Sequence, residues 1–493
     1  AALIAACAHG ASPAPYDPIR LHPDNPRYFI WRDKPTVLIG ATEEFCAVVN
    51  APFDYKTYLD TIAADRSNVI SVITGILLER GGRSTMAVAE GQLLPPWARS
   101  DTPGYTGGGN KFDLSRWDPA HFARLCDFVA EAGKRGIVVN VIILSAAYND
   151  VHWSLNPFNP VNNVNGIDAR VARNEILTID RHGGLLEYQE ALVRKIVTEL
   201  RPFENVIYTI NYRRGPNNTM EWERHMIDVL DQAQQAVGDR KLMAVNLGTN
   251  TQPGQEVDPR ISVVDHINAS PAAVAAHATA NRAVGLSYLA RELLSDPFAR
   301  MRAWEFILAG AGMFIHGDAS FSVRSPRGES QAPVTALSGG GPNQRRSLRI
   351  LTEFMDTLDY LHLRPAPELL AEPLPDGLHG RVLARPGKSY VVYVRIPSPD
   401  LRKARIVEPN GKVTFDKVVL ASLVPQPSPR RLTLRLNVTP GLYQIEWVTP
   451  ATGEVARVKP VQHSGGTLTL ETPVFSEDIA LRLLRDQSAV SQR

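Results

Sequence analysis

The chain has 493 residues and a formal net charge of +2, because 53 lysines and arginines almost balance 51 aspartates and glutamates. This balance gives no electrostatic case for a nucleic-acid partner, and the length predicts two or three domains. No apolar run approaches the roughly 18 residues of a membrane span. No spacing of cysteines and histidines predicts a metal site, and we expect no cofactor.

The first residues, AALIAACAHGASPAP, place Cys7 after a short apolar stretch and before a tether rich in proline, alanine and serine. This pattern resembles the end of a bacterial lipoprotein signal, in which the cysteine is lipidated and becomes the mature N-terminus. The alternative is an ordinary disordered N-terminus with a chance cysteine. The sequence therefore predicts a tether over residues 1–18 and lipidation at Cys7. It also predicts a location in the bacterial cell envelope, with a lipid anchor as the only contact with the membrane.

Between about residues 27 and 365, apolar runs alternate with segments of helical periodicity. Eight runs are short, rich in β-branched residues and apolar on both faces, as expected of parallel strands covered by helices. They are TVLIGA, NVISVITG, IVVNVIIL, NVIYTIN, LMAVNL, ISVVDHI, AVGLSY and GMFIHGD. This alternation predicts an α/β protein with a (β/α)8 TIM barrel. The alternative, a doubly wound sheet, usually has a glycine-rich phosphate turn after its first strand, and LIGATEEF lacks G-x-G-x-x-G.

After about residue 378 the pattern changes to a period of two, as in GRVLARPGKSYVVYVRI, RLTLRLNV and GLYQIEWVTPATGEV. Short alternating strands with glycine and proline turns predict an antiparallel β-sandwich. We therefore place the barrel at residues 19–368 and the sandwich at residues 369–493.

Several stretches resemble a known family, chiefly GGGNKFDLSRWD, NPFNPVNNVNG and RMRAWEFILAGAGMFIHGDASFS. They are similar to clan-A glycoside hydrolase-like barrels, and more narrowly to family-5-related bacterial proteins with a C-terminal sandwich named for collagen binding. GKSYVVYV, GLYQIEWVTPATGE and TPVFSEDIALRL match that sandwich. The resemblance implies a carbohydrate substrate and a retaining mechanism at the C-terminal mouth of the barrel. We expect the glycines of GGGNKFDLSRWD to fold a long loop tightly before Asp118 caps the next helix.

The resemblance also implies two catalytic glutamates, at the ends of the fourth and seventh strands, with carboxyl groups roughly 5–5.5 Å apart. Both are missing from those places. The fourth strand ends in YTINYRRG, so that Thr209 takes the first glutamate position of the family pattern and Tyr212 or Arg213 takes the catalytic one. In the seventh strand the expected glutamate falls at Ser287 or Tyr288.

Acids at other strand ends are candidate replacements. Glu43 falls where the family keeps a glutamate that faces the mouth. Asp265 precedes His266, and such a pair could tune a pKa, although adjacent strand residues point to opposite faces and only one can face the pocket. His316 and Asp318 share a face, but Asp318 could instead cap the next loop or pair with an arginine.

Amide, aromatic and cationic side chains near the predicted mouth are candidate sugar ligands, because amides bond hydroxyl groups and rings stack on pyranose faces. They are Asn110, Trp153, Asn163, Asn211, Tyr212, Arg213, His266, Tyr288 and His316. The alternative is that tryptophans in long loops form loop cores and that asparagine-rich stretches form turns.

Three functional hypotheses follow. The first is a glycoside hydrolase whose catalytic acids have moved to Glu43, Asp265 or Asp318. The second is a non-catalytic carbohydrate-binding lipoprotein that kept the cleft and lost the acids. The third is a structural or interaction protein whose cleft has no remaining role.

Overall fold

The computed structural model describes most of the chain between residues 16 and 486. The described ranges are 16–74, 84–89, 91–147, 149–212, 218–248, 256–266, 271–277, 280–287, 296–332, 339–375, 377–397, 403, 405–407, 413–415, 419 and 428–486. Cys7, Arg213 and Tyr288 lie outside these residues, so the predictions that concern them stay predictions.

The first compact unit contains a barrel of eight parallel strands in the order β4-β13-β12-β11-β10-β9-β8-β5. All eight predicted strands are confirmed. Their bounds are β4 Leu38–Thr42, β5 Val69–Ile73, β8 Val138–Ser145, β9 Val206–Tyr212, β10 Met243–Leu247, β11 Val263–His266, β12 Ala283–Ser287 and β13 Met313–Gly317. Every residue of these strands is buried, which explains why their sequences are apolar on both faces.

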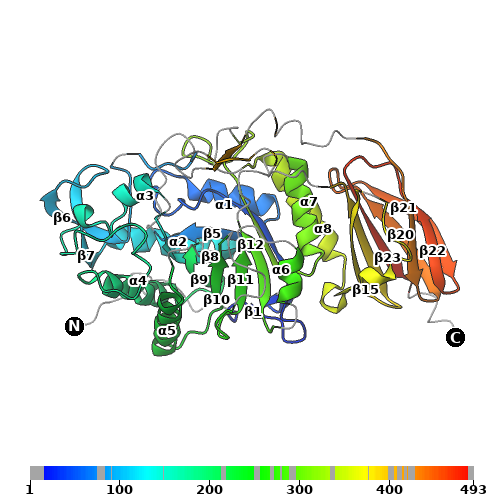
Figure 1. Ribbon diagram of the computed structural model, residues 1–493, viewed down its shortest axis with the longest axis horizontal. Helices are drawn as coiled ribbons and strands as arrows, with labels where there is room; N and C mark the ends of the chain where they lie inside the picture. Colours follow the sequence, from blue (N-terminus) through cyan, green and yellow to red (C-terminus); the bar gives the residue numbers. More distant parts are fainter. Residues whose placement is uncertain are drawn as a thin grey trace. The chain divides into compact units, whose positions relative to one another are not determined.

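Helices connect most of the strands, and Figure 1 shows α1, α4 and α5 outside them. The helices are α1 Tyr55–Ala64, α2 Pro119–Lys134, α3 Asp150–Leu155, α4 Leu185–Leu200, α5 Met220–Val237, α6 Pro271–Ala276, α7 Asp296–Ile307 and α8 Pro342–Asp356. Their starts follow the local sequence. Asp118 caps α2 by accepting a hydrogen bond from the backbone of Ala120, with Pro119 in the first turn, and Thr219 caps α5 in the same way.

Side chains complete the barrel where β4 meets β5. The side chain of Asn68 forms hydrogen bonds to β4 that a neighbouring strand's backbone would otherwise form. Its Oδ1 accepts a hydrogen bond of 2.8 Å from the backbone N–H of Ile39, and its Nδ2 donates one of 2.8 Å to the carbonyl of Val37. Farther along, the Thr42 hydroxyl donates to the Ser71 carbonyl at 3.0 Å. The strands approach so closely that a Cβ at Gly40 would lie 2.0 Å from the Val69 carbonyl oxygen, so this position requires glycine.

An apolar layer fills the N-terminal part of the barrel interior. One cluster of buried side chains contains at least one member from each of the eight strands, which identifies these residues as pointing inward. They are Leu38, Val69, Val138, Ile207, Ala244, Val263, Ala283, Met313 and Ile315. A small sheet of β1 Arg20–Leu21, β2 Phe29–Trp31 and β3 Lys34–Thr36 contributes Phe29 and Trp31 to the same cluster.

The long segment between β5 and α2 forms a hairpin of β6 Trp97–Pro103 and β7 Asn110–Trp117. Gly108 and Gly109 have φ values of 94° and 78°, which the turn requires and other residues rarely adopt. The hairpin folds onto α3 and the 3-10 turn η2 Pro160–Asn162, as the bridge between Phe112 and Asn163 shows. The expected tight folding before Asp118 is therefore observed, in the form of a hairpin.

The second compact unit is a β-sandwich with helical segments. Its six-stranded antiparallel sheet has the order β14-β15-β16-β23-β20-β21, and a two-stranded sheet pairs β19 with β22. The strands are β14 Arg364–Pro365, β15 His379–Arg385, β16 Ser389–Arg395, β17 Arg405–Val407, β18 Val413–Phe415, β19 Thr433–Val438, β20 Gly441–Val448, β21 Val455–His463, β22 Gly466–Glu471 and β23 Asp478–Arg485. One core contains side chains of both sheets, including Tyr443, Trp447, Leu436 and Leu470, which confirms the predicted sandwich.

The two units are Ala1–Arg291 with Ala311–Thr352, and Glu292–Gly310 with Glu353–Arg493. The boundary predicted at residue 368 falls inside the second unit, because α7 and the end of α8 pack with the sandwich. Arg300 of α7 forms a buried ion pair with Asp478 at 2.9 Å, and Trp304 stacks on Tyr393 with ring centroids 5.6 Å apart.

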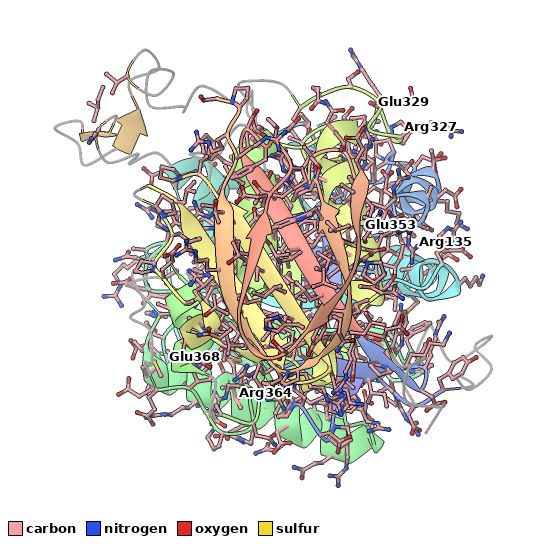
Figure 2. The ribbon with its side chains drawn as sticks, turned by 90° about the vertical axis from the view of Figure 1, so that its right-hand side faces the viewer. Arg135, Arg327, Glu329, Glu353, Arg364 and Glu368 are labelled. Atoms are coloured by element: carbon pink, nitrogen blue, oxygen red, sulfur yellow. The ribbon has the colours of Figure 1, made fainter. Side chains whose placement is uncertain are left out.

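Surface charges of both signs are interspersed. Figure 2 shows Arg327 near Glu329, and Arg364 near Glu368. This mixture agrees with the small net charge of the sequence. Within the described part of the chain, no helix has the length and the apolar character needed to span a membrane.

Candidate functional site

The inner wall of the barrel becomes polar toward the C-terminal ends of its strands. Side chains alternate along a strand, so the residues two positions beyond the apolar layer also point inward. Five neighbouring strands, from β5 to β11, place polar residues at this level. They are Ser71, Asn140, Thr209, Asn246 and Asp265, and each is at most 1% exposed.

Hydrogen bonds link these inner polar residues in two groups. On one side, Thr209 Oγ1 donates to Asn140 Oδ1 at 2.6 Å, and Asn140 Nδ2 donates to Ser71 Oγ at 3.2 Å. On the other side, Asn246 Nδ2 donates to Asp265 Oδ2 at 2.6 Å. Buried polar groups are normally paired in this way, because an unpaired one costs free energy.

The ladder register places Asn211, Asn246 and Asp265 side by side on β9, β10 and β11. Asn246 is directly paired with Asp265. Thr209 is paired with Ala244, and two residues farther along both strands Asn211 lies opposite Asn246. Each residue is the last but one of its strand. This amide–carboxyl row therefore lies at the C-terminal end of the barrel, where TIM-barrel enzymes have their active sites.

Asp265 is the one acid among the inward-facing residues of the described barrel strands. Burial raises the pKa of Asp265 to about 7, although the side chains of Ser287 and Asn246 lower it by interacting with the carboxyl group. A Cβ added to Gly285, which is paired with Asp265, would lie 3.2 Å from Asp265 Oδ1. The glycine thus leaves room for the carboxyl group, which can exchange a proton near neutral pH.

Asn211 and Ser287 occupy inward positions at the ends of the fourth and seventh barrel strands. The resemblance implies glutamates at Tyr212 or Arg213 and at Ser287 or Tyr288, and of these four Arg213 and Tyr288 lie outside the described residues. Asn211 is fully buried, and neither its Oδ1 nor its Nδ2 has a hydrogen-bond partner among the described residues. Ser287 is 1% exposed, and its Oγ makes no hydrogen bond of standard geometry to a described residue. Neither side chain can act as a general acid.

A buried aromatic pair packs at the ends of β5 and β8. The rings of Phe45 and Tyr212 lie with centroids 5.2 Å apart, and both pack on Ile73 and Ile142. Phe45 has a φ of 66°, which is unusual for a residue with a side chain. Its carbonyl accepts a hydrogen bond of 3.3 Å from Ile73, which helps to hold this conformation. The mouth therefore has an apolar side near β5 and β8 and a polar side near β9 to β11.

Glu43 follows β4 and is fully buried. Its carboxyl oxygens accept hydrogen bonds from the backbones of Cys46 at 2.9 Å and Ala47 at 3.2 Å. Burial raises the pKa of Glu43 to about 8, more than these hydrogen bonds lower it. The side chain thus shapes the turn that presents Phe45, and these contacts weigh against the predicted catalytic role at the mouth.

His316 and Asp318 share a face, as the sequence suggested, but it is the face that points away from the barrel interior. Met313 and Ile315 of the same strand point inward, so His316 points outward. Asp318 Oδ2 accepts a hydrogen bond of 2.6 Å from Arg345 of α8, and its Oδ1 accepts one of 2.9 Å from the backbone of Ser320. Burial lowers the pKa of His316 to about 4. These contacts favour the alternative in which Asp318 pairs with an arginine.

His266 also points away from the interior, because its neighbour Asp265 points inward. Its ring lies 5.9 Å from that of His277, which follows α6. The two residues of the predicted acid–histidine pair therefore lie on opposite faces of β11, and the structure does not bring them together on one side.

Two of the predicted sugar-binding asparagines, Asn163 in the loop after β8 and Asn110 in the β6–β7 hairpin, are engaged in their own loops. Asn163 is 5% exposed and donates from Nδ2 to the carbonyls of Pro157 and Asn159, both at 3.0 Å. Asn110 donates to the Ser100 carbonyl at 2.7 Å. The half-buried Trp153 accepts a hydrogen bond of 2.9 Å from Asn159 at its carbonyl. These hydrogen bonds are local, and they give the two asparagines a role in turns.

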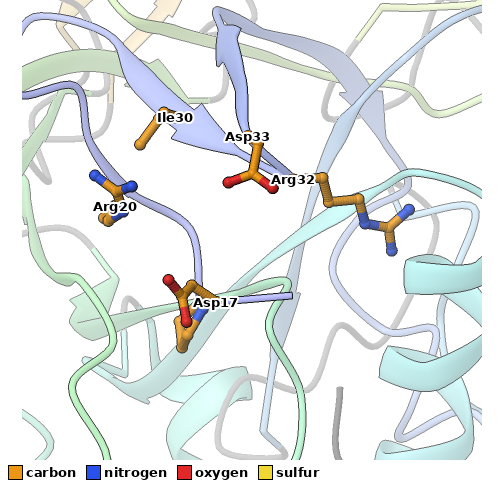
Figure 3. Close-up of a pocket in the computed structure, with 6 residues that line it drawn as sticks. Asp17, Arg20, Ile30, Arg32 and Asp33 are labelled. Carbon is orange, nitrogen blue, oxygen red and sulfur yellow. The ribbon is translucent and has the colours of Figure 1, made fainter. Parts of the chain in front are cut away.

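A shallow hollow lies at the opposite end of the barrel, near the N-terminal ends of the strands (Figure 3). Asp17, Arg20, Ile30, Arg32 and Asp33 line it together with Pro18. Arg32 pairs with Glu204, just before β9, at 2.6 Å, and the other charged side chains are exposed. The hollow holds no buried, unpaired polar group. Among the described residues, no three side chains of histidine, cysteine, aspartate or glutamate gather as they would around a metal ion.

Sequence reasoning did not identify Asn246 or Phe45. The position of Asn246 in LMAVNL could have indicated it, because it stands at the end of a predicted strand, as Asp265 does. Its partnership with Asp265 depends on the register between two strands, which no local pattern shows. Phe45 gave no signal, because its conformation is set by Glu43 and Ile73.

Comparison with known proteins agrees with this architecture. No model of a known protein family matches the chain, and no curated protein matches it either. Among solved structures, a glycoside hydrolase family 5 protein from Bacteroides vulgatus ATCC 8482 is 13% identical with a TM-score of 0.61, over 96% of this chain and 95% of that one. A structure described as a glycoside hydrolase is also 13% identical, with a TM-score of 0.59, over 96% of this chain and 97% of the other.

The protein therefore has the fold of a clan-A, family-5-like glycoside hydrolase barrel with a C-terminal β-sandwich. The likeness extends over nearly the whole length of both solved structures. The fold expected from the sequence resemblance is confirmed.

Proposed function

We propose that the protein binds an oligo- or polysaccharide at the C-terminal mouth of its barrel and does not hydrolyse it by the two-carboxylate mechanism. The observation that carries this proposal is the chemistry of the inward-facing strand ends. Asn211 and Ser287 occupy the ends of the fourth and seventh strands, and Asp265 is the one inward-facing acid of the described strands. Retaining and inverting hydrolysis both need two carboxyl groups, roughly 5–10 Å apart.

The two-sided mouth supports sugar binding. A pyranose ring combines apolar C–H faces with hydroxyl groups at its edges, so its sites usually combine aromatic rings with convergent polar groups. Here Phe45 and Tyr212 provide the rings, and Asn211 with Asp265 provides the polar groups. The other predicted acids, Glu43 and Asp318, are engaged in a turn and in an ion pair.

A hydrolase that uses Asp265 is the second candidate function. Its support is the pKa of Asp265, which burial raises to about 7, in the range of a general acid or base at neutral pH. This mechanism would require a second acid beside Asp265, and of the other predicted acids Glu43 is held in a turn and Asp318 in an ion pair.

One experiment separates these functions. The purified protein is applied to a glycan array, and the same glycans are assayed for the release of new reducing ends. Binding without release supports the proposal. Release that Asp265→Asn abolishes, while the exposed control Asp17→Asn retains it, establishes the hydrolase. If no glycan binds, both functions are rejected and an interaction role becomes the remaining hypothesis.

The predicted cell-envelope location remains a proposal, because it depends on Cys7. Expression of the gene with its natural upstream sequence in a bacterium fed a labelled fatty acid tests it. Label on the wild-type protein and none on a Cys7→Ser variant supports a lipid anchor, and equal labelling of the two contradicts it.

A further inference from the structure

The helix α7 connects two strands of the barrel but belongs to the second compact unit. That unit comprises Glu292–Gly310 and Glu353–Arg493, whereas Ala311–Thr352, which contains β13, belongs to the first unit. The chain therefore leaves the second unit just before β13 and returns to it within α8. Both ends of the segment that carries β13 are thus covalently attached to residues of the second unit.

The strand β13 closes the barrel. In the strand order of the described residues, β13 lies between β12 and β4. Its register with β4 begins with Met313 opposite Leu38. The joint between β4 and β5, by contrast, depends on side chains such as that of Asn68. Displacement of β13 would therefore separate β4 from the rest of the ladder.

The sequence of α7 does not favour an independent helix. Every residue from 298 to 307 except Arg302 is buried, so the apolar side chains form no single stripe with a polar face opposite. Two of the buried residues, Arg300 and Glu305, are charged. A helix of this length is also marginal in water without tertiary contacts. The helix therefore depends on its partners in the second unit.

Arg300 anchors α7 to β23. Its guanidinium group forms ion pairs with Asp478 at 2.9 Å and with Glu477, just before that strand, at 2.5 Å. Asp478 also accepts a hydrogen bond of 2.9 Å from the Tyr393 hydroxyl group, and the Tyr393 ring stacks on Trp304 of α7. Removal of Arg300 would leave the Asp478 carboxyl group buried without its cation, which is costly.

Glu305 anchors the same helix with the opposite charge. Its carboxyl group pairs with Arg395 of β16 at 2.6 Å and with Arg381 of β15 at 2.8 Å. The cation of α7 thus meets anions at one strand, and its anion meets cations of two others. This complementarity fixes the register and the direction of the helix on the sheet, since a shifted or reversed helix would bring like charges together.

We infer that the second unit acts as a clamp that holds the barrel closed, because it anchors the chain on both sides of the segment that carries β13. The end of α8 is anchored as well, since Phe354 lies against Trp304 with ring centroids 4.9 Å apart. Without α7, a long flexible connection would join β12 to β13, and its conformational entropy would oppose closure. This role does not depend on glycan binding, and it differs from that of a separate binding module.

The test is hydrogen–deuterium exchange, followed by mass spectrometry, on the full-length chain. Glu305→Gln weakens the clamp mildly and Arg300→Met strongly. The matched control is Arg385→Met, because Arg385 pairs with Asp359 on the surface of the same unit. We expect the backbone amides of β13 and β4 to exchange at least about tenfold faster in both clamp variants, with a smaller change in β8 and β9. The control should exchange like the wild type.

Each other outcome counts against the clamp. Faster exchange confined to β16 and β23 would show that the sandwich loosens without opening the barrel, and this would overturn the inference. Wild-type exchange of β13 and β4 in both variants would overturn it too. Equal acceleration in β8 and β9 would mean a general loss of stability, with no particular role for β13. If Arg300→Met does not fold, the milder Glu305→Gln decides between these outcomes.

Discussion

Asn246 donates a hydrogen bond of 2.6 Å to Asp265 Oδ2 inside the barrel, and the two residues are directly paired on neighbouring strands. Asn246→Ala removes this donor from the buried carboxyl group. We expect the variant to lose about 1–3 kcal/mol of unfolding free energy. Urea unfolding measures this loss, and the exposed Asn343→Ala should change stability by less than about 0.5 kcal/mol.

A double variant tests whether the loss comes from the hydrogen bond between the two side chains. Asn246→Ala with Asp265→Ala leaves no buried carboxyl group to satisfy, so its loss should be smaller than the sum of the two single losses. Additive losses would mean that the hydrogen bond contributes little.

Glu43 makes stability depend on pH. Burial raises its pKa from an ordinary value of 4.5 to about 8 in the folded chain. Between these values the folded state holds a proton that the unfolded state releases, so the unfolding free energy falls as the pH rises, by up to about 1.4 kcal/mol per pH unit. Glu43→Gln should flatten this part of the profile. Urea unfolding from pH 4.5 to 8 measures the difference, and parallel profiles would contradict the assignment.

Asp318 should matter for stability and not for ligand binding. Its side chain and that of Arg345 are 1% and 3% exposed, and they form an ion pair of 2.6 Å on the outer side of β13. Arg345→Met leaves Asp318 buried and uncompensated, which should cost about 3–5 kcal/mol. Asp318→Asn should lower the melting temperature and leave glycan affinity unchanged. A folded Asp318→Asn variant that loses glycan affinity would contradict this assignment.

Arg300 should be essential to the second unit. It pairs with Asp478 at 2.9 Å, where the two side chains are 5% and 1% exposed. We expect Arg300→Met to cost about 3–5 kcal/mol by leaving Asp478 buried without its cation. The matched control is Arg385→Met, because Arg385 pairs with Asp359 on the surface, with 40% and 48% exposure. It should cost less than about 1 kcal/mol. Equal losses in thermal unfolding would refute this ranking.

Asn163 should act in the loop after β8 and not on sugar. Its amide nitrogen bonds two loop carbonyls, so Asn163→Ala should increase cleavage of this loop by protease. Glycan affinity should stay within about twofold of the wild type. A large loss of affinity without a change in proteolysis would restore Asn163 as a sugar ligand.

The sequence was sufficient to predict the barrel and the sandwich. Buried parallel strands are apolar on both faces, and this pattern can be read locally in runs such as IVVNVIIL. The change to an apolar–polar alternation with a period of two after residue 378 likewise predicts the antiparallel sheets. The helix α7 was predicted, but its packing against the sandwich was not, because Arg300 and Asp478 are separated by 177 intervening positions.

The candidate site was less accessible to sequence reasoning, because it depends on which face of each strand turns inward. The spacing of His316 and Asp318 showed that they share a face, but only the closed barrel shows that this face points outward. The sequence identifies Asp265 as an acid at a strand end. That Asn246 is its partner follows only from the register between β10 and β11. The sequence does not distinguish Asn211, whose side-chain polar atoms have no hydrogen-bond partner among the described residues, from Asn163, whose amide group bonds its own loop.

The most direct test of the central claim is a reducing-end assay of the wild-type protein with a glycan that it binds on the array. Binding without new reducing ends, over an incubation in which a family-5 hydrolase degrades its own substrate, is the predicted result. Release of reducing ends by the wild-type protein that Asp265→Asn abolishes and Asp17→Asn retains would contradict the claim and establish a hydrolase.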